Sequence, residues 1–183
     1  MNGRIVYSAK ECAYIAVFVA LVIGIQLTLT FLPGIELVTA LFVCYAFAMG
    51  YGRGMVAATA FSVLRQTVFG VDLKVLVLYL VYYNALTFIF GLLGKKLKPT
   101  VQGAVWTALL ASICTLVFTL FDNLLTPFWL GFTAREAKLY FYASMPFMIP
   151  QVICTLISVA TLFLPLTKVF LWLRGSLKNS SRG

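Results

Sequence analysis

The sequence predicts an all-α membrane protein, a single domain over residues 1–183 in which six transmembrane helices form a bundle and both termini are cytoplasmic. Composition is the first reason. Of the 183 residues, 62% are hydrophobic and 10% are charged, whereas soluble domains are typically about half apolar and about a quarter charged. The second reason is that the apolar residues fall into six runs. The third is the uneven distribution of lysine and arginine between those runs.

The six predicted spans are apolar runs separated by breaks that contain glycine, proline or charge. A helix needs about 20 apolar residues to cross a hydrocarbon core about 30 Å thick. The second and third runs are short and separated only by a glycine turn, so we expect them to form a tight helical hairpin. In order, the spans cover residues 11–32, 36–51, 54–71, 75–94, 103–126 and 144–172.

The breaks fix where each span ends. The first three spans end at "LPGIE" (32–36), "GYGRG" (50–54) and "GVDLK" (70–74), and the fourth ends at the basic "GKKLKPTVQG" (94–103). The fifth span is followed by the long segment 126–142, which we expect to be an irregular outer loop. Loops of this length without regular structure are often functional, and Gly131 would give this one a hinge.

Lysine and arginine are more abundant in the cytoplasmic loops of membrane proteins. With six spans, the termini and the second and fourth breaks share one side, which carries ten basic residues against three on the other. We therefore expect a multi-pass protein of a prokaryotic plasma membrane with cytoplasmic termini. The ten are Arg4, Lys10, Arg53, Lys95, Lys96, Lys98, Lys168, Arg174, Lys178 and Arg182, and the three are Lys74, Arg135 and Lys138.

Several classes of function are disfavoured by what the sequence lacks. It has no histidine, and its four cysteines each lie alone in an apolar run, so we expect no zinc site, haem or disulfide framework. The basic residues form no face for nucleic acid. Without HExxH, GxSxG or a histidine base, we expect neither an enzyme nor a cofactor.

One polar pair interrupts the third span. In "FSVLRQTVFG" (61–70), Arg65 and Gln66 lie among apolar residues. A rise of about 1.5 Å per residue places Arg65 about 16 Å from the inner end of the span, in the outer half. A charge inside the membrane costs about 2.5–3.5 kcal/mol on insertion scales. Arg65 either extends to the outer headgroups or faces a pocket, where its charge would be balanced by a ligand or by Asp122, Asp72 or Glu36.

Other polar and aromatic side chains collect at the same outer level, whereas the inner thirds of the third to fifth spans are apolar. A pore needs polar lining along its whole length, so this one-sided distribution predicts a pocket that faces outward, with 126–142 as its lid. Aromatic faces suit flat heterocycles, and amides and charges fix their orientation. The predicted site residues are Glu36, Arg65, Gln66, Asp72, Tyr79, Tyr83, Asn84, Asp122, Asn123, Trp129 and Gln151.

Small residues form a stripe on the first span. Ala16, Ala20 and Gly24 recur every four residues and therefore lie on one helix face. Small faces allow helices to approach closely in lipid. The stripe suits packing within the chain, and it equally suits docking of another membrane subunit.

Three local features and the six-span layout resemble the substrate-binding (S) components of energy-coupling factor (ECF) vitamin transporters. The features are Ala16-xxx-Ala20, "LPGIELVT" (32–39) and "LRQTVFG" (64–70). The resemblance implies that the first three helices dock on a transmembrane coupling subunit through an AxxxA-type face. It also implies that helices four to six and the outer loops, including the one after helix three, enclose a vitamin. It also implies two cytoplasmic ATPases as partners, and the chain itself has no GxxxxGK[ST] motif.

Other functions stay open at this point. The main alternative is a self-sufficient small secondary transporter or channel, although such proteins typically have inverted repeats or broken helices, and neither is evident. A membrane scaffold would leave the outer polar residues without a role. The substrate is also open, since pyridoxine, a thiamine precursor, riboflavin, a pterin or cobalamin would each suit an aromatic pocket with amides and charges.

Overall fold

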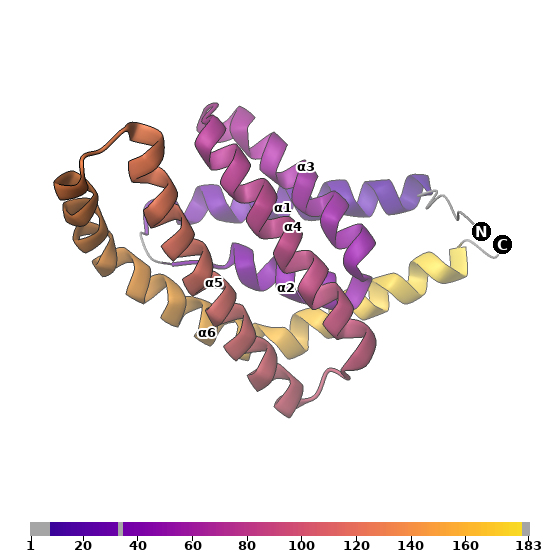
Figure 1. Cartoon of the computed structure of the whole chain (residues 1–183). Helices are drawn as coiled ribbons and strands as arrows, with labels where there is room; N and C mark the ends of the chain where they lie inside the picture. The colour runs from indigo at the N-terminus through magenta and orange to yellow at the C-terminus, as the bar shows by residue number, and fades with distance from the viewer. Residues whose placement is uncertain (1–7, 33–34, 181–183) are drawn as a thin grey trace, which may run out of the picture.

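The structure, a computed structural model, describes residues 8–32 and 35–180. Within these ranges the chain forms helices and no strands, so the prediction of an all-α fold is confirmed for the described residues (Figure 1). Pro33 and Gly34 of the first break, and the terminal Arg4 and Arg182, lie outside the described residues. The helices are α1 (Ala9–Leu29), α2 (Val38–Met49), α3 (Tyr51–Phe69), α4 (Leu73–Lys96), α5 (Val101–Leu130) and α6 (Ala134–Ser180).

Four of the described helices, α1, α4, α5 and α6, are long and apolar enough to cross a membrane, as expected of a multi-pass membrane protein. The helix α2 has 12 residues, which is a length of about 18 Å, well short of a hydrocarbon core of about 30 Å. The helix α3 has 19 residues but is not among the four, because its sequence includes Arg53, Arg65 and Gln66. Six crossings therefore remain a prediction.

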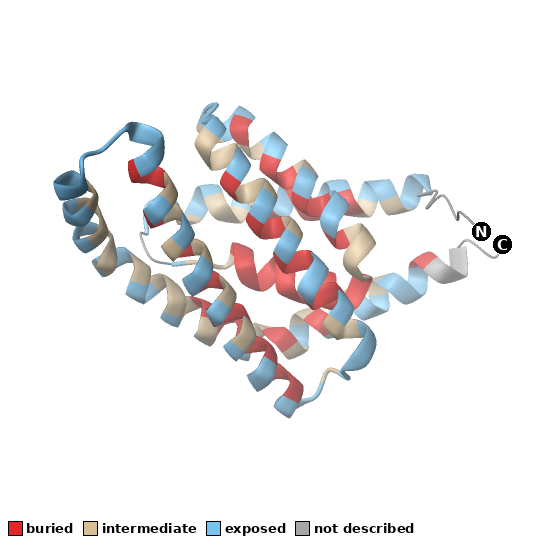
Figure 2. Cartoon of the chain, in the orientation of Figure 1, coloured by how far each residue is buried: buried red, intermediate tan, exposed pale blue. Residues whose placement is uncertain are grey.

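The short helix α2 occupies the centre of the bundle. All of its residues from Val38 to Met49 are buried, and it packs mainly against α4 and α6 and also against α3 (Figure 2). A helix that is apolar on every side is stable only when it is surrounded. The ring of Phe42 contacts the aromatic rings of Phe18 on α1, Phe61 on α3 and Tyr83 on α4, with centroids 5.4, 5.2 and 4.8 Å away.

Glycine allows the helices to meet at close range at one end of α4. Gly50, with φ of +90°, is the single residue that joins α2 to α3. A Cβ atom on Gly94 would lie 2.0 Å from the carbonyl oxygen of Phe47, and one on Gly91 would lie 2.3 Å from the backbone nitrogen of Tyr51. The last turns of α4 therefore lie directly against the backbone of the α2–α3 turn.

The predicted irregular loop 126–142 is wrong. The helix α5 continues to Leu130, Gly131 ends it with φ of +68°, and α6 begins at Ala134. Thr133 and Glu136 explain this early start, because the Glu136 carboxylate accepts hydrogen bonds from the Thr133 backbone nitrogen at 2.7 Å and hydroxyl at 2.8 Å. The Glu136 nitrogen donates to the Thr133 hydroxyl at 3.4 Å, so the sequence "TARE" is a capping box. Only a short link remains of the predicted lid.

The bundle has two distinguishable ends. The helix α1 begins and α6 ends at the same end, while the α3–α4 and α5–α6 links lie toward the other (Figure 1). At the first end Arg53 forms an ion pair with Glu11, and Arg174 donates to the backbone oxygen of Ala48 at 2.9 Å. The second end holds most of the polar side chains discussed below.

Candidate functional site

Polar side chains from α3, α4, α5 and α6 line one cavity near the α3–α4 and α5–α6 links. Its volume is about 370 Å³, and we call it the polar cavity. The cavity brings together five of the predicted site residues, which come from four helices and from positions up to 86 residues apart (65 to 151). These five are Arg65, Tyr79, Asp122, Asn123 and Gln151.

The guanidinium of Arg65 lies between α1, α3 and α4. Its Nε donates a hydrogen bond to Oε1 of Gln26 at 3.1 Å. It also lies 4.5 Å from the ring centroid of Phe69 and 4.6 Å from that of Tyr79, within range of cation–π attraction. Gln26 in turn donates to the Tyr79 hydroxyl at 3.3 Å. These contacts hold the charge inside the bundle.

A second cavity of about 250 Å³ adjoins the first. It lies between α1, the segment before α2, α3 and α4, and Arg65 and Tyr79 line both cavities. Glu36 and Gln26 line only the second one. The Arg65 side chain thus forms part of the wall that the polar cavity and the second cavity share.

The Glu36 carboxylate is held by uncharged donors. It accepts hydrogen bonds from the hydroxyls of Thr39 at 3.0 Å and Tyr83 at 3.3 Å, and from Nε2 of Gln151 at 2.5 Å. The ion pairs among the described residues do not include Glu36. This carboxylate ties the segment before α2 to α4 and α6, and it forms one wall of the second cavity.

Asp122 is paired with Lys74 and not with Arg65. Lys74 Nζ lies 3.4 Å from Oδ1 of Asp122 and 2.9 Å from the hydroxyl of Thr126. The Thr126 hydroxyl donates to the same Asp122 oxygen at 2.8 Å. Both Lys74 and Asp122 line the polar cavity, and their charges cancel each other. The positive charge of Arg65, which lines the same cavity, is therefore not balanced by Asp122.

The remaining predicted site residues do not line the polar cavity. Asp72 caps the start of α4, accepting from the backbone nitrogens of Lys74 and Val75 at 2.9 and 3.2 Å. Gln66 is buried and accepts from the Asp72 nitrogen at 3.0 Å. Both residues therefore build the α3–α4 link.

Three further predicted site residues also lie outside the polar cavity: Asn84, Tyr83 and Trp129. Asn84 accepts from the Thr59 hydroxyl at 3.2 Å and donates to the backbone oxygen of Leu80 at 2.8 Å, so it joins α4 to α3. Tyr83 is 2% exposed and belongs to the aromatic core. Trp129 is exposed near the end of α5.

Sequence reasoning missed six polar residues of the two cavities. The polar cavity is also lined by Lys74, Thr119, Tyr140 and Ser144, and the second cavity by Gln26 and Thr30. Lys74 had a visible signal, because it follows the capping Asp72 at the outer end of a span. Tyr140 was hidden by the mistaken loop 126–142, since only its place on α6 turns it inward, whereas Ser144 was already the first residue of the predicted span 144–172.

The small-residue stripe on α1 faces away from the other helices. Ala16, Ala20 and Gly24 are all exposed, and a Cβ atom on Gly24 would have no neighbour within 4 Å. Packing within the described part of the chain therefore does not use this face.

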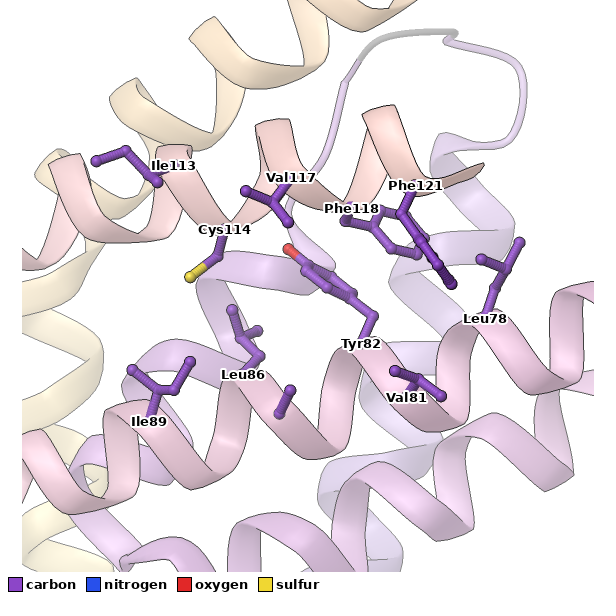
Figure 3. A pocket seen from close by; sticks show the side chains of 11 residues that line it. Leu78, Val81, Tyr82, Leu86, Ile89, Ile113, Cys114, Val117, Phe118 and Phe121 are labelled. Carbon is purple, nitrogen blue, oxygen red and sulfur yellow. The ribbon is translucent and has the colours of Figure 1, made fainter. Parts of the chain in front are cut away.

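An apolar groove lies between α4 and α5 (Figure 3). Its volume is about 360 Å³, and its walls carry side chains such as Val81, Ile89 and Val117. The ring of Tyr82 lines the groove, and its hydroxyl lies 3.2 Å from the Thr115 hydroxyl and 3.3 Å from the Thr39 hydroxyl, both of which are buried. Such a surface suits a hydrocarbon chain, because its walls are apolar apart from the Cys114 thiol and the engaged Tyr82 hydroxyl.

The described residues contain no group of three or more histidine, cysteine, aspartate or glutamate side chains placed so that they could hold a metal ion. All four cysteines are free.

In comparisons with known proteins, no family model, no curated protein and no solved structure matches the chain significantly.

Proposed function

We propose that the chain is the substrate-binding component of an ECF-type transporter, which captures a vitamin or related micronutrient outside a prokaryotic cell. A transmembrane coupling subunit and two cytoplasmic ATPases would deliver it. The observation that carries the proposal is the polar cavity at one end of an otherwise apolar bundle. Its volume of about 370 Å³ falls within the range of small-molecule sites, about 300–1,000 Å³.

The opposite end of the bundle favours a binding subunit over a channel. There the backbone of α4 touches the α2–α3 turn at Gly91 and Gly94, and α2 fills the centre with apolar side chains. Close packing of this kind favours a protein that binds its ligand at one end over one that conducts it through the bundle. Transport then requires partner subunits that supply energy and movement.

The stripe Ala16/Ala20/Gly24 gives such partners a docking face. It is exposed, and small residues let two helices approach closely in lipid, where packing and not water drives association. In the proposed topology six helices cross the plasma membrane with cytoplasmic termini. The ion pair Arg53–Glu11 then lies near the cytoplasmic side, and the polar cavity opens outside.

Copurification tests the proposal. An affinity-tagged chain, expressed in its native cells and extracted in mild detergent, should bring down a membrane subunit and two ATPases. The double variant Ala16→Trp/Ala20→Trp should lose these partners. The control is Val17→Trp/Leu21→Trp, which places two tryptophans at exposed positions of α1 beside the stripe and should keep the partners.

One result would overturn the proposal, and a second would overturn only its docking face. One is a wild-type chain that purifies without partners and transports solute alone in proteoliposomes, which would identify a self-sufficient secondary transporter or channel. The other is partner capture that survives Ala16→Trp/Ala20→Trp and is lost in the control, which would place the docking face elsewhere.

A further inference from the structure

We propose that the ligand of the polar cavity carries an anionic group, a carboxylate or a phosphate, that binds the guanidinium of Arg65. The inference rests on the proposed function, since it names the ligand class of the same site. Its first support is the absence of a protein counter-anion for Arg65. The chain contains five acidic residues, and the described structure shows what each of them does.

Every acidic side chain is engaged away from Arg65. Two are in ion pairs with other cations, two cap helices, and one is surrounded by three uncharged donors. No carboxylate oxygen of the described residues lies within 4.0 Å of the Arg65 guanidinium. In the same order, the five are Glu11 and Asp122, then Asp72 and Glu136, then Glu36.

The hydrogen-bonding state of Arg65 is the second support. A guanidinium has five N–H donors, and the Nε donor of Arg65 is used by Gln26. In the described structure neither Nη atom has a hydrogen-bond partner, although the residue is only partly exposed. A cation left without a partner inside a bundle is costly. The free Nη edge matches the paired oxygens of a carboxylate or phosphate, which arginine binds in a bidentate manner.

The neighbours of Arg65 hold it ready for such a ligand. Gln26 fixes the Nε side, and the rings of Phe69 and Tyr79 lie 4.5 and 4.6 Å from the guanidinium. Side-chain positions fixed in this way lower the ordering cost of binding. Because the Lys74–Asp122 pair is neutral overall, the charged groups that line the polar cavity sum to one positive charge.

The rest of the polar cavity defines the body of the ligand. Phe118, Tyr140 and Phe147 add aromatic walls to that of Tyr79, which suit a flat ring. Asn123 and Gln151 offer amide groups to ring substituents. Among the described residues, the only side-chain partner of the Asn123 amide nitrogen is the Met148 sulfur at 3.9 Å. The class is therefore a small aromatic or heterocyclic carboxylate or phosphate ester.

Binding of matched compounds to the purified full-length chain tests the inference. Each set presents one ring, benzene, pyridine or pyrimidine, as the carboxylate, the primary amide, the aminomethyl derivative and the phosphate ester of its hydroxymethyl derivative, with inorganic phosphate alongside. Equilibrium dialysis and thermal shift in detergent report binding. We expect at least one carboxylate or phosphate ester to bind at least about tenfold more tightly than its amide and amine, and the arm that binds distinguishes the two anions.

Variants assign the effect to Arg65. Arg65→Gln should weaken anion binding about 10- to 100-fold, as expected for the loss of charge-assisted hydrogen bonds. Arg65→Lys, which keeps the charge but loses the planar fork, should fall between Arg65→Gln and the wild type and covers the case in which Arg65→Gln does not fold. The matched control Arg135→Gln removes an exposed arginine at the same end of the molecule and should bind normally.

The outcomes separate this inference from the proposed function. It is overturned if no anion in the panel binds, if an amide or amine binds as tightly as its acid, or if folded Arg65→Gln and Arg65→Lys both bind like the wild type. A chain that binds an anion through Arg65 but captures no ATPases overturns only the proposed function. A chain that captures its partner subunits but binds only neutral ligands overturns only the inference that the ligand is an anion.

Discussion

Replacing Gly94 by alanine should destabilise the protein, although the same change usually stabilises a helix. Alanine is favoured over glycine inside a helix by about 0.5–1 kcal/mol. At Gly94, however, the new Cβ would lie 2.0 Å from the Phe47 carbonyl oxygen and 2.9 Å from the Phe47 Cα. These are backbone atoms, so α4 must move away from α2 by about 1 Å to reach the shortest tolerated contact of 3.0 Å.

The size of the effect follows from two opposing contributions. Overpacking of this kind costs about 1–3 kcal/mol, and the gain in helix propensity offsets up to about 1 kcal/mol of it. With the full offset, we expect a net loss of up to about 2 kcal/mol in the free energy of unfolding. The assay is SDS-induced unfolding in dodecylmaltoside micelles, followed by near-ultraviolet circular dichroism of the buried aromatic side chains.

A matched control separates packing from propensity. Gly175 lies in α6, and a Cβ atom there would meet nothing within 4 Å. Gly175→Ala should therefore leave stability unchanged or raise it by up to about 1 kcal/mol. If Gly94→Ala raises stability as much as Gly175→Ala does, then α4 and the end of α2 do not touch there, and the bundle is not closed at that end.

Two further predictions follow from other contacts. Glu36→Gln should lower the free energy of unfolding by about 1–3 kcal/mol, because hydrogen bonds to a charged acceptor contribute about 1.5–3 kcal/mol each and Glu36 accepts three. The same unfolding assay measures this change. An unchanged free energy of unfolding would mean that the three donors do not need a charged carboxylate. A cysteine at Thr133, which is exposed in the α5–α6 link, should react with an impermeant maleimide in intact cells, and labelling only after permeabilisation would reverse the topology.

The sequence predicted the level of the polar residues better than their direction. Rise along a helix places Arg65, Asp122 and Gln151 at similar depths, and these three line one cavity. Direction depends on rotation of about 100° per residue and on which neighbour each helix meets. Asn84 is at a suitable depth but is turned toward Thr59 on α3, which no single-helix pattern determines.

Two predictions that the structure corrects could have been avoided from the sequence: Asp72 as a site residue, and the start of the last helix at residue 144. Asp72 directly precedes a helix, where aspartate commonly caps the first turn, and it does so here. The capping box Thr133–Glu136 likewise marks the start of α6 ten residues before the predicted span at 144. By contrast, the Lys74–Asp122 pair joins residues 48 positions apart. The sequence alone could not show that Asp122 pairs with Lys74 and not with Arg65, because this depends on how α4 packs against α5.

The position of α2 has a consequence for how the protein is made. During synthesis α2 leaves the ribosome long before α6, yet the ring of Phe47 packs against Phe163 with centroids 4.9 Å apart. The interval of 116 residues (47 to 163) takes about 6–23 s at about 5–20 residues per second. Throughout that time a helix too short to cross the bilayer lacks one of its two main neighbours. The nascent chain must therefore shelter α2 with α1, α3 and α4, or with an insertion chaperone, until its last helix arrives.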